Sequence, residues 1–104
     1  MEGETGLLVT SDTIAETCYA LASNYGVARA AIVDSVSSLL ARRNIDTIPF
    51  PKTYAIQALG FCRDSGRVSF ADAMLWASAA SRGDRVITFD RRFPADSIEV
   101  VFPT

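Results

Sequence analysis

The feature that most constrains the fold is the alternation of short apolar runs with longer segments whose apolar residues recur at helical spacing. The runs predict strands over residues 7–10, 45–50, 85–89 and 98–102. The longer segments predict one helix that follows the cap residues 11–13 and ends near Asn24, and further helices over residues 27–43, 51–63 and 70–82. Strands that alternate with helices favour a mostly parallel sheet covered on both faces. With 104 residues, the chain is therefore predicted to form one domain, residues 1–104, with a three-layer α/β/α fold.

Residues 69–93, SFADAMLWASAASRGDRVITFDRRF, show this alternation most clearly. Ser69 has the residue type and position of a helix cap, Gly83 closes the helix, and a buried strand follows it. The unit places one carboxylate, Asp72, in the first helical turn and a second, Asp90, directly after the strand. Taken singly, Asp72 is explained as part of a helix cap and Asp90 as the start of a turn.

A third carboxylate, Glu16, stands early in the first predicted helix, at capping-box spacing from Thr13. The carboxyl ends of parallel strands share one edge of a sheet, where ligands bind, so Asp90 and Glu16 are expected near that edge. The position of Asp72 depends on how its helix folds back. Carboxylates crowded together raise one another's pKa unless a cation neutralises them. The three acids together therefore predict a divalent-metal site, a kind of site suited to phosphodiester hydrolysis.

The composition narrows the choice of metal and of partner. The chain has no histidine, which excludes histidine acid–base chemistry and most zinc or copper sites, so oxygen ligands and Mg²⁺ or Mn²⁺ are expected. The net charge of −2 excludes a broadly basic nucleic-acid-binding protein. Cys18 and Cys62 match no zinc spacing and are expected to be buried. No run approaches the roughly 20 apolar residues of a membrane span, and MEGETG does not look like a secretory signal, so a cytoplasmic protein without a membrane segment is expected.

Three segments, TSDTIAETCYALASNYG, SFADAMLWASAASRG and RVITFDRRF, occur in an order and at separations that resemble the later motifs of PIN-domain nucleases, especially VapC-type toxin ribonucleases. Glu16 matches the family's Glu early in a helix. Asp72, followed by Ala73, matches the "DA" step that opens a later helix. Thr88 to Asp90 match the "TFD" that closes the next strand. The resemblance covers nearly the whole chain.

The resemblance implies a Mg²⁺- or Mn²⁺-dependent endoribonuclease with a three-layer fold. It implies that Glu16, Asp72 and Asp90 are catalytic and hold the metal. Thr88, Arg91 and Arg92 are the candidates for contacting the RNA substrate. It also implies a homodimer and, for a toxin, a cognate antitoxin protein as partner.

The chain departs from the family pattern at its start. The family opens with an apolar strand that ends in Asp and is followed by a helix, and nothing in this sequence matches it. We therefore expect an N-terminally truncated fold that lacks the family's central strand and its Asp. A misplaced start codon, a fragment, a decayed gene and a sheet closed by pairing with a partner all remain open.

Two other functions compete with the ribonuclease. The first is a non-catalytic PIN-like remnant that serves as a protein-binding module. The second is a receiver-like domain with Asp90 as phosphoacceptor. Such domains usually need a lysine at a strand end, and the only lysine, Lys52, lies elsewhere.

Overall fold

A computed structural model describes residues 5–103, within which the chain forms four helices and four strands. In chain order these are β1 (Leu7–Thr10), α1 (Ser11–Ser23), α2 (Arg29–Leu40), β2 (Ile45–Ile48), α3 (Lys52–Gly60), α4 (Phe70–Arg82), β3 (Val86–Ile87) and β4 (Val100–Val101). The predicted α/β fold with parallel strands is confirmed. None of the helices in this part of the chain is long and apolar enough to cross a membrane.

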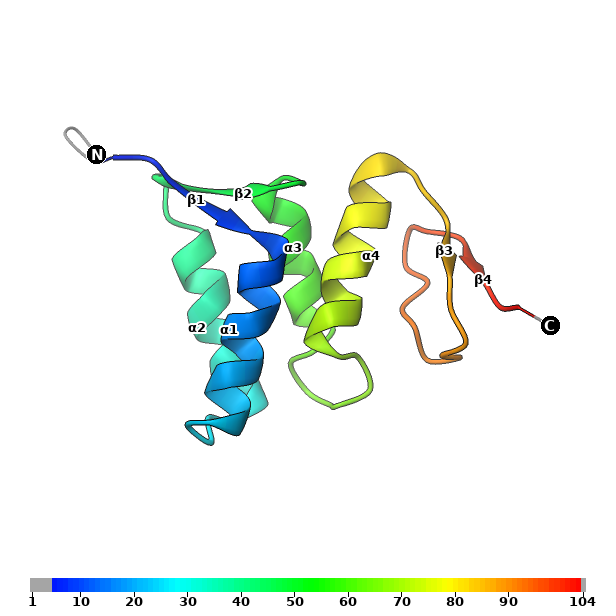
Figure 1. Cartoon of the computed structure of the whole chain (residues 1–104), viewed down its shortest axis with the longest axis horizontal. Coiled ribbons are helices and arrows are strands. Elements are labelled where there is room, and N and C mark those ends of the chain that lie inside the picture. The colour runs from blue at the N-terminus through cyan, green and yellow to red at the C-terminus, as the bar shows by residue number, and fades with distance from the viewer. Residues whose placement is uncertain (1–4, 104) are drawn as a thin grey trace.

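The strands are arranged as two separate sheets. β1 pairs with β2 in parallel, with Leu7 opposite Ile45, and β3 pairs with β4 in parallel, with Val86 opposite Val100. Within residues 5–103 no strand joins the two pairs, where the sequence predicted one continuous sheet. Figure 1 shows β1 and β2 running across the ends of the first three helices, and β3 and β4 beyond α4.

Each two-stranded sheet leaves the outer edge of both of its strands without a strand partner in the described part of the chain. The Leu7 N–H donates to the Asn44 carbonyl over 2.7 Å, so the Leu7 backbone faces β2. Backbone groups of successive strand residues point to opposite edges, so those of Leu8 face the open edge. In the second sheet the Val86 N–H donates to the Glu99 carbonyl, and the Ile87 backbone faces away. The Leu8 and Ile87 side chains are 64% and 71% exposed.

The core lies between the helices. Its largest fully buried side chains are Trp76, Phe70, Ile32, Leu40, Leu59, Cys18 and Cys62. The most extensive contact between helices joins α3 to α4, and the ring of Phe61, which follows α3, meets that of Trp76 edge to face at 4.9 Å. The Trp76 indole N–H donates to the Asp96 carbonyl over 2.8 Å, which ties the segment between β3 and β4 to α4.

Arg29, at the start of α2, holds the connection between α3 and α4. Its Nη1 donates to the carbonyls of Cys62 and Val68, each over 3.1 Å, and its guanidinium lies 4.7 Å from the centre of the Phe70 ring. These contacts fix the point at which α4 begins, and hence the position of Asp72.

Candidate acidic site

Asp72 lies in the first turn of α4 and is half-buried. The predicted cap is confirmed, because the Ser69 side-chain oxygen accepts the Asp72 backbone N–H over 3.0 Å. This hydrogen bond involves the backbone N–H of Asp72. Among the described residues, the Asp72 carboxylate itself has no hydrogen-bond partner. A carboxylate near a helix N-terminus is also favoured by the helix dipole. Capping and a functional role for the side chain are therefore compatible.

Glu16 is exposed on α1, which packs against α4. Tyr19, one turn further along α1, meets Phe70 edge to face at 5.3 Å, and its hydroxyl accepts the Ala71 N–H over 3.3 Å. Because Tyr19 follows Glu16 by one turn and Ala71 precedes Asp72, this contact places the two acids on facing segments of α1 and α4.

β3 ends at Ile87, so Asp90 lies three residues beyond the strand, whereas the sequence predicted it directly after the strand. Its backbone N–H donates to the Thr88 hydroxyl over 3.1 Å, and its Oδ1 accepts the Arg92 N–H over 2.8 Å. The Arg92 Nε lies 3.7 Å from the same carboxylate oxygen. The Asp90 carboxylate therefore already has a local cation and a backbone donor.

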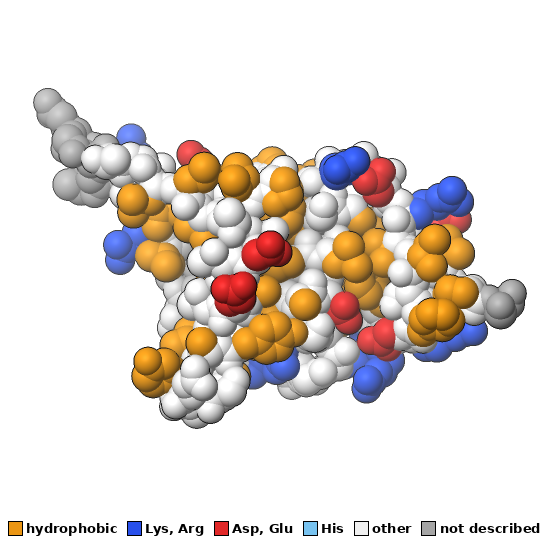
Figure 2. All heavy atoms as spheres, viewed as in Figure 1, with side chains coloured by type: hydrophobic (Ala, Val, Ile, Leu, Met, Phe, Trp, Pro, Cys, Tyr) orange, Lys and Arg blue, Asp and Glu red, His pale blue; other side chains and the backbone are white. Residues whose placement is uncertain are grey.

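The three acids do not form a metal site as they stand. Among residues 5–103 no three His, Cys, Asp or Glu side chains are close enough to hold one metal ion together. Figure 2 shows acidic side chains over α1 and, further along the same face, between the start of α4 and the end of β3, with Lys and Arg side chains at the margins. The donor set therefore does not fit a divalent ion without rearrangement.

The predicted substrate-binding residues all have contacts within the protein. Thr88 accepts the Asp90 N–H and Arg92 pairs with Asp90. The Arg91 guanidinium lies 4.5 Å from the centre of the Phe102 ring, just beyond β4. These contacts stabilise the turn that presents Asp90.

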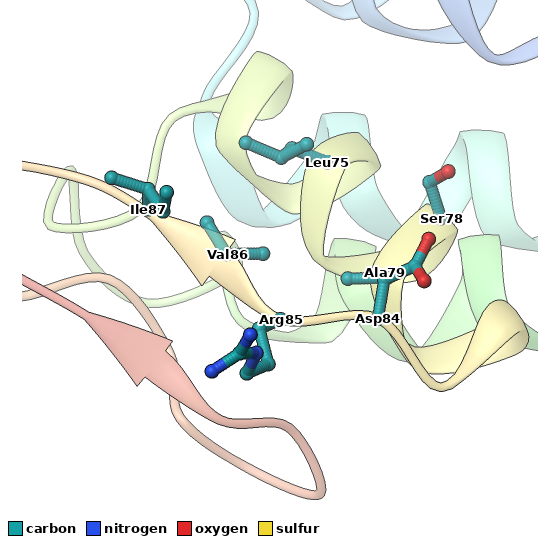
Figure 3. A pocket seen from close by; sticks show the side chains of 7 residues that line it. All are labelled: Leu75, Ser78, Ala79, Asp84, Arg85, Val86 and Ile87. Carbon is teal, nitrogen blue, oxygen red and sulfur yellow. The ribbon is translucent and has the colours of Figure 1, made fainter.

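Two hollows beside β3 were not anticipated from the sequence. The larger, of about 400 Å³, is lined by Asp84, Arg85, Ile87 and Val101. The smaller, of about 190 Å³, lies between α4 and β3 and adds Leu75, Ser78, Ala79 and Val86 to Asp84, Arg85 and Ile87, as Figure 3 shows.

Comparison with known families matches the chain to the PIN domain over residues 1–96. The chain therefore belongs to the PIN domain family. PIN domains are typically nucleases, which act on nucleic acid and generally use divalent metal ions. No match was found among curated proteins or among solved structures.

Proposed function

We propose that this chain is a cytoplasmic, Mg²⁺- or Mn²⁺-dependent endoribonuclease of VapC type, the toxin of a toxin–antitoxin pair. The observation that carries the proposal is the family match over residues 1–96, combined with the placement of Glu16 and Asp72 on two packed helices. In this proposal Glu16, Asp72 and Asp90 are the catalytic and metal-binding residues. Thr88, Arg91 and Arg92 contact the RNA.

The proposal requires the acidic face to rearrange when a metal binds. Asp90 would have to exchange Arg92 for the metal, and this exchange is available because Arg92 is an exposed side chain in a short turn. Surface ion pairs of this kind contribute only about 0–1 kcal/mol, so the exchange costs little.

The test is cleavage of a mixed RNA substrate with Mg²⁺ or Mn²⁺. We expect cleavage by the wild-type chain and its loss both in EDTA and in an Asp72→Asn variant. This variant keeps the backbone N–H that Ser69 caps, so the fold should be retained. Cleavage that survives in EDTA or in Asp72→Asn would contradict the assigned site.

One observation favours a second function, a non-catalytic PIN-like module that binds a protein. It is the lack, within residues 5–103, of a ready group of three metal ligands. This module would show no cleavage and no Mn²⁺-dependent stabilisation, whereas the nuclease should gain stability when Mn²⁺ binds the folded state. A melting temperature that rises with Mn²⁺ in the wild type but not in Asp72→Asn would exclude the module.

The remaining proposals concern partners. We propose a homodimer and, for the toxin, a cognate antitoxin as a second protein partner. The open edge of β1 supports the homodimer, because Leu7 and Leu8 are 54% and 64% exposed on a strand without charged residues. Exposed apolar edge strands readily pair with another chain.

A further inference from the structure

The β3 segment presents exposed apolar side chains on its outward face. Side chains alternate between the two faces of a strand. Val86 is 4% exposed, whereas Ile87 and Phe89 are 71% and 84% exposed. The Thr88 N–H donates to the Val101 carbonyl over 3.0 Å, so pairing with β4 continues past Ile87. The exposed apolar face of this segment therefore consists of Ile87, in β3, and Phe89, at a bend two residues after β3 ends.

The larger hollow beside this face has the size and lining of a ligand site. Its volume of about 400 Å³ falls within the roughly 300–1,000 Å³ of small-ligand pockets. Ile87 and Val101 supply apolar walls, and Arg85 and Asp84 supply a cation and a hydrogen-bond acceptor. A nucleotide has matching parts, namely a flat apolar base with donor groups on its edge and an anionic phosphate.

The charges around the hollow favour an anionic occupant. Residues 82–92 contain four arginines and two aspartates, in a chain whose net charge is −2. Arg82 pairs with Asp84 at 2.9 Å and Arg92 lies 3.7 Å from Asp90, which accounts for both aspartates. Within the described residues Arg85 has no carboxylate partner. Figure 2 shows hydrophobic side chains over β3 and β4 with Lys and Arg side chains around them.

We propose that this face, defined by Arg85, Ile87 and Phe89 with Val101, binds single-stranded RNA. One base stacks on Phe89, a neighbouring base enters the hollow against Ile87 and Val101, and Arg85 contacts a phosphate. Aromatic side chains stack on bases that are unpaired, and such contacts suit any sequence, so a single strand is preferred over a duplex. The inference rests on the proposed nuclease, because Phe89 precedes Asp90 and would guide the strand to it.

The test measures binding apart from cleavage. The probe is a fluorescein-labelled, mixed-sequence single-stranded RNA oligonucleotide, followed by fluorescence anisotropy in EDTA, with the matching duplex as a second probe. We expect Phe89→Ala to weaken binding about tenfold or more. Arg85→Ala should lower the slope of log affinity against log salt concentration by about 0.7. The duplex should bind more weakly than the single strand.

Matched controls are an exposed aromatic residue and an exposed arginine elsewhere. Tyr25, which is 76% exposed between α1 and α2, and Arg43, beyond α2, serve this purpose. Tyr25→Ala and Arg43→Ala should leave the affinity for RNA nearly unchanged. Equal losses in Phe89→Ala and Tyr25→Ala would overturn the inference, since they would show general rather than local binding.

The outcomes separate this inference from the proposed catalysis. A wild-type chain that binds single-stranded RNA through Phe89 in EDTA, yet never cleaves it, supports the inference and contradicts the nuclease. Cleavage by the wild type with unchanged RNA affinity in Phe89→Ala overturns the inference alone. If Phe89→Ala and Arg85→Ala change the oligomeric state of the protein in solution but not its affinity for RNA, the face binds protein and the inference is wrong.

Discussion

The two cysteines illustrate how burial alone sets the chemistry of a side chain. Cys18 and Cys62 are both fully buried in the core. Burial raises the thiol pKa of Cys18 from 9.0 to about 11, with the nearby Cys62 adding to the rise. Burial likewise raises the pKa of Cys62 to about 11, against an opposing effect of Arg29. The sequence predicted the burial of both, and their role is to fill the core.

These raised pKa values predict a loss of stability at alkaline pH. Above about pH 9 the unfolded chain loses thiol protons that the folded chain keeps until about pH 11, so stability should fall as the pH rises between these values. Urea unfolding from pH 8 to pH 11 measures this. A Cys18→Ala, Cys62→Ala variant should show a smaller fall across the same range than the wild type. An equal fall in both would contradict the assignment to the thiols.

At the scale of single residues, contacts between neighbours in the sequence were predictable, whereas contacts between residues far apart in the sequence were not. The Ser69 cap on Asp72 followed from a spacing of three residues. The pairing of Asp90 with Arg92 and of Arg91 with Phe102 depends on the fold of a turn and on β4. The Asp90 side chain accepts the N–H two residues on, as expected for an Asp that starts a turn, whereas no spacing rule gives the contact of Arg91 with Phe102.

Among the elements, α4 is the one that the sequence determines most completely. The predicted range, residues 70–82, agrees with the observed helix, because both ends carry strong local signals. Ser69 caps the start. Gly83 adopts the left-handed conformation at φ 73°, which glycine reaches without strain, and donates its N–H to the Ala79 carbonyl.

Removal of the Ser69 cap should lower the free energy of unfolding by a predictable amount. Ser69→Ala deletes the acceptor for the Asp72 N–H, and such a loss typically costs about 1 kcal/mol. Urea unfolding should show this as a lower midpoint at an unchanged slope. The control is Ser38→Ala, at an exposed position inside α2, where alanine is the better helix former and no loss is expected. Equal stability of Ser69→Ala and the wild type would mean that the cap contributes nothing.

The strands were less predictable than the helices. β1 has its predicted range, but β3 and β4 each keep only two residues of the five predicted. A helix closes its hydrogen bonds within one segment, whereas a strand extends only as far as a partner pairs with it. α3 is also shorter than predicted: it ends at Gly60, after which the N–H groups of Phe61 and Cys62 donate three residues back. The sequence shows whether a segment prefers a helix or a strand, but it does not show how many residues of a strand will pair with a neighbouring strand.

At the scale of the whole molecule, the sequence predicted the class of fold and the family but not the joining of its parts. The parallel strands and the match to the PIN domain were anticipated. The division into two sheets was not, because strand neighbours are chosen by tertiary packing. The candidate site depends on the same choice. Asp90 lies between the two strands of the second sheet, whereas Glu16 and Asp72 lie on two packed helices, and residues 5–103 contain no group of three metal ligands.

The open edge of β1 leads to a prediction about assembly. Its backbone groups at Leu8 point outward, and Leu7 and Leu8 are more than half exposed. Two copies that pair along this edge about a two-fold axis would satisfy those groups and cover both leucines. The protein should then have a mass in solution of twice its 11.2 kDa chain, and light scattering after size-exclusion chromatography measures it.

Leu8→Lys should convert this dimer to a monomer, because a lysine on the edge opposes pairing and would face its own copy across the axis. The fold should survive, since Leu8 is 64% exposed and contributes little to the core. Leu39→Lys is the matched control, as Leu39 is a 45% exposed leucine on α2, and it should leave the dimer intact. A monomeric wild type, or a dimer that persists in Leu8→Lys, would show that β1 is not the contact between copies.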